Sequence, residues 1–142
     1  MSKQDQGSQL TGMAGEFLTV GKLFKRGYQA SVTFGNAKAI DVFVYNMKTN
    51  KSFTVQVKTS RYKNNFQMSK ESIISDCIYI FVVLNKFEQE EFFYIVPGYD
   101  ILADINKFYG ASYRNPDKQS DRPAINYGPL NAYKDNWQVF DG

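Results

Sequence analysis

One continuous apolar run, Ile78–Leu84, constrains the fold more than any other segment of the chain. It reads Ile-Tyr-Ile-Phe-Val-Val-Leu and follows a single cysteine, Cys77. A strand with apolar side chains on both faces is typical of the centre of a sheet that is buried on both sides. We therefore expect a sheet with this run at its centre and with Cys77 as a small buried thiol.

The segments around this run predict helices and further strands. An apolar stripe at helical spacing predicts a helix from Leu10 to Arg26, formed by Leu10, Met13, Ala14, Phe17, Gly21 and Phe24 and widened by Val20 and Leu23. Further strands are expected at residues 28–34, 39–45, 52–59 and 92–96, and a last helix at residues 100–109. The second and third strands are close enough in the chain to form a hairpin. The predicted fold class is α/β, with a central mixed β-sheet flanked by helices in the order α-β-β-β-linker-β-β-α.

The length of 142 residues predicts one domain with a sizeable core. We expect a flexible tail at residues 1–9 and a single domain at residues 10–142, with a long irregular segment at residues 110–136 that is rich in Asn, Asp, Pro and Tyr. The N-terminal segment is polar, and no apolar run approaches the roughly 20 residues that cross a bilayer. These features predict a cytoplasmic protein that does not enter a membrane.

The composition excludes several kinds of chemistry. The chain has no histidine, which excludes an imidazole base and histidine-ligated zinc. One cysteine excludes an internal disulfide and a cysteine-rich metal site.

Charge is distributed unevenly along the chain. The net charge is only +3, but residues 17–70 carry ten Lys or Arg side chains against one acid, Asp41, whereas residues 71–142 carry six bases and eleven acids. A local excess of this size favours a polyanion as partner. A solvated basic surface is the alternative interpretation.

Four polar residues interrupt segments that otherwise belong to the core. Asp41 lies inside an apolar predicted strand, where an unpaired carboxylate is costly to bury. Gln56 and Lys58 alternate with Val55 and Val57, so both point to the face opposite these valines. Glu16 shares a line of the first helix with Val20 and Leu23 and leans toward the core. Asp41 and Gln56 carry oxygen ligands that suit Mg²⁺.

These residues resemble the PD-(D/E)XK nuclease superfamily, whose pattern is a helix with Glu, a strand with Asp, and a hairpin strand with an acid or Gln two residues before Lys. The matching positions are Glu16, Asp41, and the triplet Gln56-Val57-Lys58, with fourteen residues between Asp41 and Gln56. The resemblance covers roughly residues 8–96 and is nearest to Holliday-junction resolvases and to methyl-directed restriction enzymes that use Gln-x-Lys. Ile40 stands at the place of the family's proline, and Gln56 replaces the more usual acid, which removes one negative charge from the metal site.

The resemblance implies a restriction-endonuclease-like fold and hydrolysis of DNA with Mg²⁺ or Mn²⁺. It implies that Asp41, Gln56, the Val57 carbonyl and Glu16 hold the metal and that Lys58 assists the reaction. Duplex or branched DNA is the implied partner, and a homodimer is expected because small nucleases of this fold often act in pairs. The basic side chains expected to hold phosphate are Lys38, Arg61 and Lys63.

Other interpretations of the same residues remain open. Asp41 and Lys58 can form a structural ion pair, and Arg61 and Lys63 can belong to a solvated loop. Tyr62 and Phe66 can stack on bases or anchor the core. At the level of the protein, the alternatives are a catalytically inactive nuclease fold that binds nucleic acid or a protein, and a protein-interaction module such as an inhibitor.

Overall fold

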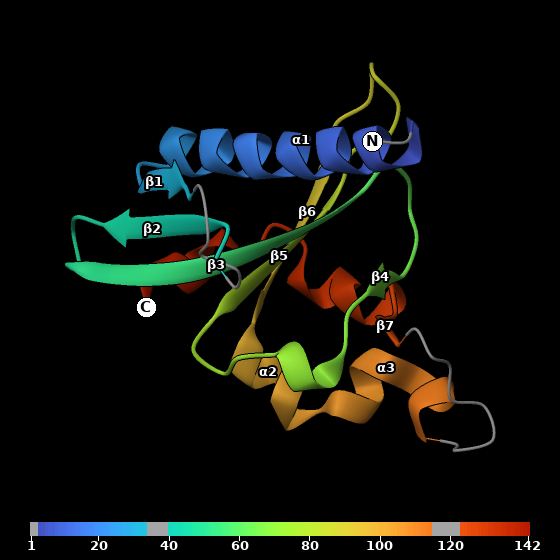
Figure 1. Cartoon of the computed structure of the whole chain (residues 1–142). Helices are drawn as coiled ribbons and strands as arrows, with labels where there is room; N and C mark the ends of the chain where they lie inside the picture. Colours follow the sequence, from blue (N-terminus) through green and yellow to red (C-terminus); the bar gives the residue numbers. More distant parts are fainter. Residues whose placement is uncertain (1–2, 34–39, 115–122) are drawn as a thin grey trace.

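A five-stranded mixed sheet forms the centre of the computed structural model, which describes residues 3–33, 40–114 and 123–142 (Figure 1). The strand order is β1-β2-β3-β5-β6; β3 and β5 are parallel, and the other neighbours are antiparallel. The strands are β1 (Gln29–Val32), β2 (Val42–Asn46), β3 (Lys51–Ser60), β5 (Ile78–Val83) and β6 (Phe92–Pro97). All six residues of β5 are buried, which confirms the prediction of a central strand covered on both faces.

Helices lie on both faces of the sheet, so the predicted α/β class is confirmed. Helix α1 (Lys3–Lys25) lies along one face, and α2 (Gly98–Ala103) and α3 (Ile105–Arg114) lie on the other side (Figure 1). A two-stranded sheet pairs β4 (Phe66–Gln67) with β7 (Ala124–Ile125). The described residues also form short 3-10 helices: η1 (Lys70–Ser72), η3 (Gly128–Tyr133) and η4 (Trp137–Asp141).

The sheet separates two hydrophobic cores, and β5 contributes to both through its alternating side chains. Ile78, Ile80 and Val82 pack in the core beneath α1, which also contains Leu23, Trp137 and Phe140. Their neighbours Tyr79, Phe81 and Val83 pack in the core beneath α2 and α3, with Phe66, Ile101, Phe108 and Leu130. On the second face, the helices cover β5 and β6 but leave part of β2 and β3 open, as the 46% exposure of Phe43 indicates.

The first helix differs from its prediction in both length and orientation. It begins at Lys3 instead of Leu10, so residues 3–9 continue the helix and do not form a separate tail. The residues of α1 that are buried against the sheet are Gly15, Thr19 and Leu23, whereas most of the predicted apolar stripe faces outward. Helical spacing identified an apolar line correctly but assigned it to the wrong face, because a second line of small and apolar residues packs better against the sheet.

The C-terminal third also contains more structure than its composition indicated. The single helix expected at residues 100–109 is two helices that are separated at Asp104. The segment 110–136, expected to be irregular, contains the end of α3, β7 and η3 within its described part. Tyr109 donates a hydrogen bond from Oη to the carbonyl oxygen of Met68 at 2.7 Å, which ties α3 to the segment before η1. These elements are stabilised by contacts between distant segments, which local propensity does not reveal.

Candidate active site

Asp41 is fixed between two strands, immediately before β2. Its backbone N–H donates to the Val55 carbonyl at 2.9 Å, and its own carbonyl accepts from the Thr33 N–H at 2.9 Å. Its side-chain Oδ2 accepts a hydrogen bond from the Val57 backbone N–H at 2.8 Å. The carboxylate therefore occupies the place beside β3 where a longer β2 would have continued the ladder.

Val57 directs a second oxygen toward the same place. In an antiparallel ladder, the N–H and C=O of one residue point toward the same neighbouring strand. Because the Val57 N–H points to Asp41, the Val57 carbonyl also points to the edge of β3 beyond the start of β2. The side chain of Val57 remains in the core, with 9% of its surface exposed. The backbone of this residue, and not its side chain, contributes to the site.

Gln56 and Lys58 lie on the face of β3 opposite the Val57 side chain. They alternate with Val55 and Val57 along β3, and both are half-buried. Two strand residues on the same face are about 6.6 Å apart along the strand. An amide and an ammonium group therefore lie on one face of β3, and their action on the Asp41 carboxylate stays a prediction.

Glu16 approaches the same carboxylate from α1. Burial raises the pKa of the Glu16 carboxyl, and the charge of Asp41 and a hydrogen bond between the two carboxyl groups raise it further. The approach depends on Gly15, because a Cβ at that position would lie 1.8 Å from Thr59 Oγ1 and 2.8 Å from Thr59 Cβ. The absence of a side chain at Gly15 lets α1 lie against β3 and brings Glu16 to Asp41.

The residues that converge here fit a hard divalent cation. The Asp41 and Glu16 carboxyl groups meet here beside the Val57 backbone, and with the amide oxygen of Gln56 they would make an all-oxygen set, which Mg²⁺ prefers together with several waters. In the part of the chain that the structure describes, no ion pair joins Asp41 to Lys58, so the alternative of a structural pair gains no support. The described residues contain no group of three or more His, Cys, Asp or Glu side chains. Only two acids are present because Gln56 stands where a third would be.

The two basic residues that follow β3 are held in different ways. The ammonium group of Lys63 lies 4.6 Å from the centre of the Tyr127 ring, and the N–H of Tyr127 donates to Asn65 Oδ1 at 2.9 Å. Arg61 is anchored through its carbonyl, which accepts from the Asn85 N–H at 2.9 Å. Lys38 lies outside the described residues.

The two aromatic residues of this segment differ in exposure. Phe66 is buried in the second core, which excludes it from stacking on a base. Tyr62 is 60% exposed and remains available for stacking. The sequence alone left both alternatives open for both residues.

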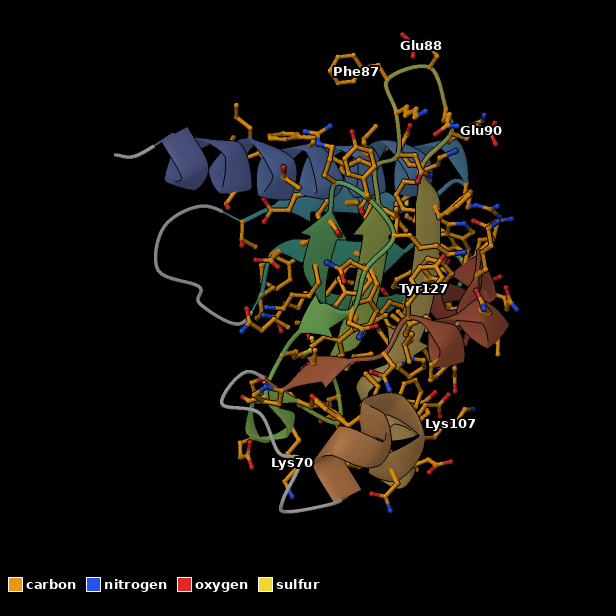
Figure 2. The ribbon with its side chains drawn as sticks, turned by 90° about the vertical axis from the view of Figure 1, so that its right-hand side faces the viewer. Lys70, Phe87, Glu88, Glu90, Lys107 and Tyr127 are labelled. Atoms are coloured by element: carbon orange, nitrogen blue, oxygen red, sulfur yellow. The ribbon has the colours of Figure 1, made fainter. Side chains whose placement is uncertain are left out.

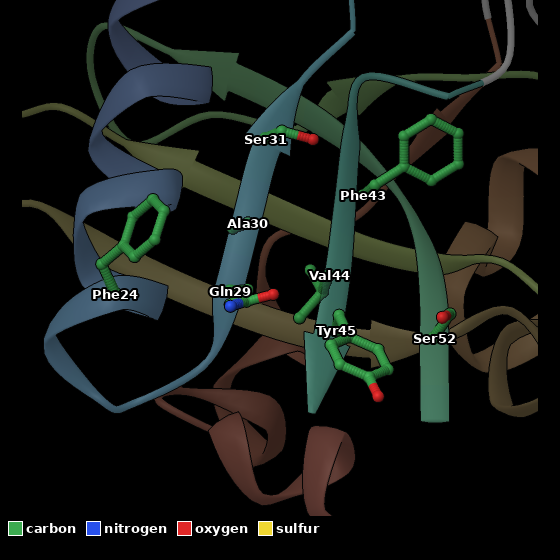
Figure 3. A pocket seen from close by; sticks show the side chains of 8 residues that line it. All are labelled: Phe24, Gln29, Ala30, Ser31, Phe43, Val44, Tyr45 and Ser52. Carbon is green, nitrogen blue, oxygen red and sulfur yellow. The ribbon is translucent and has the colours of Figure 1, made fainter. Parts of the chain in front are cut away.

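A polar hollow of about 500 Å³ is lined in part by Arg61. It lies between the N-terminal half of α1 and the end of β3 and is lined by Gly7, Ser8, Thr11, Thr59, Ser60 and Arg61. One guanidinium and several hydroxyl groups suit a phosphate. Another hollow, of about 540 Å³, lies at the other end of the β1–β2–β3 hairpins, between Phe24 and Phe43, and no charged side chain lines it (Figure 3).

Three residues of the site had no signal that the sequence analysis could use. Gly15 and Thr59 set the approach of α1 to β3, and Tyr127 supports Lys63 from more than 60 residues away. A helical glycine followed by Glu was visible, but its contact with Thr59 depends on how the helix crosses the sheet. Only the tertiary structure shows these roles.

A comparison with solved structures gives the class of fold to which this arrangement belongs. The chain is similar to a bacterial homing endonuclease, I-Ssp6803I, with a TM-score of 0.60 over 94% of this chain and 91% of that chain. The identity is 16%, so the likeness establishes a shared nuclease-like fold and not a shared reaction. No protein-family model matches the chain, and no curated protein matches it.

None of the helices in the described residues has the length and apolar character of a membrane span. This finding agrees with the sequence, which contains no long apolar run.

Proposed function

We propose that this chain is a metal-dependent endonuclease of the PD-(D/E)XK type that hydrolyses phosphodiester bonds in DNA. The observation that carries the proposal is the hydrogen bond from the Val57 N–H to Asp41 Oδ2, which joins the Asp strand to the Gln-x-Lys strand. The raised pKa of Glu16 beside Asp41 adds a third element, α1, to the same point. The nuclease-like fold supports the proposal without establishing it.

Each residue has a distinct part in the proposed reaction. Asp41, Gln56, the Val57 carbonyl and Glu16 would hold Mg²⁺ or Mn²⁺, which supplies an activated water and neutralises charge on the phosphate. Lys58 stabilises the negative charge that develops in the transition state and helps to orient the attacking water. Arg61 and Lys63 hold phosphates on either side of the cleaved bond.

DNA is the proposed substrate because the positive charge extends along the chain from the site. Ten basic residues in residues 17–70, against one acid, form a surface that attracts a phosphate backbone. A homodimer is part of the proposal, since hydrolysis of both strands of a duplex needs two sites.

A second candidate function is favoured by one observation. Gln56 reduces the acids at the site to two, which weakens affinity for a divalent metal. A chain with this fold can then bind nucleic acid or a protein partner without cleaving. Titration calorimetry with Mn²⁺ separates the two, because only the nuclease requires a heat of binding that Asp41→Ala removes.

The decisive experiment is a cleavage assay on plasmid, single-stranded and four-way-junction DNA with Mg²⁺ or Mn²⁺. We expect the wild type to cleave at least one substrate, and we expect Asp41→Ala to lose that activity and Lys58→Ala to lose about 100-fold or more with the fold intact. Circular dichroism of each variant controls for folding. Equal cleavage by wild type and Asp41→Ala would place the reaction elsewhere, and no cleavage by folded wild type would favour the binding protein.

A further inference from the structure

The outward face of α1 is apolar and uncovered. Leu10, Met13, Phe17 and Phe24 are 66%, 43%, 51% and 55% exposed. Their spacing of three, four and seven residues places them on one line of the helix. This line is opposite the line that packs on the sheet, so the protein's own core cannot cover it.

A loop beside α1 extends the same apolar surface. The loop between β5 and β6 projects past α1 and carries Phe87 at its tip, with 91% of the side chain exposed (Figure 2). Its base contacts the flank of α1 at a hollow of about 160 Å³, which is lined by Leu18, Leu84 and Phe87 and also by the charged Arg61, Lys86 and Glu91. The outer surface of α1 therefore has a raised aromatic border along one side.

The exposed apolar area on this side of α1 is large enough for a protein–protein interface. Three half- to fully exposed Phe side chains, with one Leu and one Met, offer on the order of 500 Å² of apolar area. Monomeric proteins rarely expose a contiguous apolar patch of more than a few hundred Å². A standard interface buries about 800 Å² per partner, somewhat more than half of it apolar, which matches this area with a polar rim around it.

We propose that this face binds the same face of a second copy of the chain, with the two α1 helices antiparallel and the two-fold axis at Phe17. The stripe is symmetric about that residue: Leu10 and Phe24 are each seven positions away, so each meets the other across the interface. Met13 and Gly21 are each four positions away. A Cβ at Gly21 would have nothing within 4 Å, so this position offers open space for the Met13 side chain of the second copy.

The charges on α1 favour the antiparallel orientation. The last turns carry Lys22 and Lys25, and no acidic residue lies between Glu16 and the end of the helix. Lys22 turns toward the sheet, with its ammonium group 5.7 Å from the centre of the Phe93 ring, so Lys25 is the base nearer to the stripe. In the antiparallel pair, Lys25 lies at the level of Gln9 of the second copy, which is uncharged. In a parallel pair, the basic C-terminal turns of the two helices would lie side by side. Their positive charges would then repel each other, and so would the two helix dipoles.

The same geometry places both candidate sites on one side of the pair. Adjacent helix residues differ by about 100°, so Glu16 points roughly at right angles to the contact made by Phe17. A two-fold rotation leaves any direction parallel to its axis unchanged. Because the axis is perpendicular to both helices and Glu16 points roughly along it, both Glu16 side chains point toward the same side. This inference rests on the proposed function and adds the class of substrate. The substrate is a double-stranded nucleic acid that lies across the two sites on one face of the pair.

Sedimentation equilibrium tests the association directly. At about 100 µM, well above the micromolar Kd that an interface of this size supports, we expect the wild type at twice 16.3 kDa. Phe17→Asp buries an unpaired charge at the axis, and we expect it to weaken association by at least about 30-fold. The matched control is Leu102→Asp, which alters a 40% exposed apolar residue on α2 and should still dimerise. Wild type that sediments as a monomer would overturn the proposal, and the face would then serve a different partner.

Cross-linking tests the axis and the orientation. Cys77 is buried, so new cysteines on α1 are the reactive thiols. Phe17→Cys lies on the axis and should form dimers with a short bis-maleimide. Leu10→Cys alone should not, because its two copies lie about 21 Å apart along the helices, but a mixture with Phe24→Cys should. Cross-linking of Leu10→Cys with itself would indicate a parallel pair and overturn the model. Neither test involves cleavage, so the interface and the nuclease proposal can fail independently.

Discussion

At the scale of single residues, the site depends on where Asp41 places its carboxylate. The sequence showed an acid in an apolar strand, and the structure shows how it is satisfied: the Val57 N–H donates to it, and Glu16 lies beside it. Two neighbouring carboxyl groups repel each other unless a proton or a cation lies between them. The site is therefore more stable with Glu16 protonated or with a metal bound.

This repulsion predicts a pH-dependent gain in stability for Glu16→Gln. The pKa of Glu16 is raised above its ordinary value of 4.5 in the folded state. The stability that the protonated Glu16 carboxyl contributes is fully present below pH 4.5 and is lost as the pH rises through the raised pKa of the folded state. Without metal, we expect Glu16→Gln to raise the free energy of unfolding at pH 7 by less than about 1 kcal/mol, since the group is partly solvated, and to have little effect near pH 4.

Urea unfolding with a chelator at both pH values measures this difference. Glu88→Gln, on the exposed loop after β5, removes the same charge far from Asp41 and serves as the control. Added Mg²⁺ should then stabilise the wild type more than Glu16→Gln. A loss of stability in Glu16→Gln at pH 7 would show that the carboxylate is paired with a positive group.

At the scale of elements, the crossing of α1 over β3 decides whether Glu16 reaches the site. The side chain of Thr59 fills the space where a Cβ of Gly15 would be, and the buried hydroxyls of Thr19 and Thr59 have no hydrogen-bond partner. The close contact between α1 and β3 is therefore kept even though these two hydroxyl groups form no hydrogen bond. The two unpaired hydroxyl groups lower the stability of the fold, but the close contact that buries them brings Glu16 to the site.

Gly15→Ala should separate the two elements. The added methyl group meets Thr59 Cβ, which cannot rotate away, so α1 has to shift. We expect a loss of about 1–3 kcal/mol in the free energy of unfolding and a loss of cleavage beyond what reduced stability explains. Gly12→Ala is the matched control: its Cβ meets nothing within 4 Å, and better helix propensity should stabilise it by up to about 1 kcal/mol. Similar effects of the two variants would contradict the close contact.

At the scale of the whole molecule, the two proposals together predict how a plasmid is cut. A dimer with both sites on one side should cut both strands in one encounter and convert supercoiled plasmid to the linear form. Phe17→Asp has one site per particle, so we expect nicked circles to accumulate several-fold before linear product appears. Gel analysis of a time course checks this, with Leu102→Asp as control. Equal product ratios in all three proteins would show that one chain cuts both strands.

The sequence by itself determined the parts of this protein that depend on alternation and local pattern. It predicted β5 as a buried central strand, the shared face of Gln56 and Lys58, and an α/β order of elements. Each of these follows from the period of two in a strand or from a continuous apolar run, which the chain carries locally.

The tertiary structure decided which faces meet. It turned the apolar stripe of α1 outward, brought Glu16 to Asp41 through Gly15, and paired β4 with β7 from distant parts of the chain. A helix with two apolar lines does not show in its sequence which line will pack on the sheet. That choice depends on the shape of the partner surface: only the line with Gly15 can lie against Thr59, so the larger side chains of Leu10, Phe17 and Phe24 remain outside.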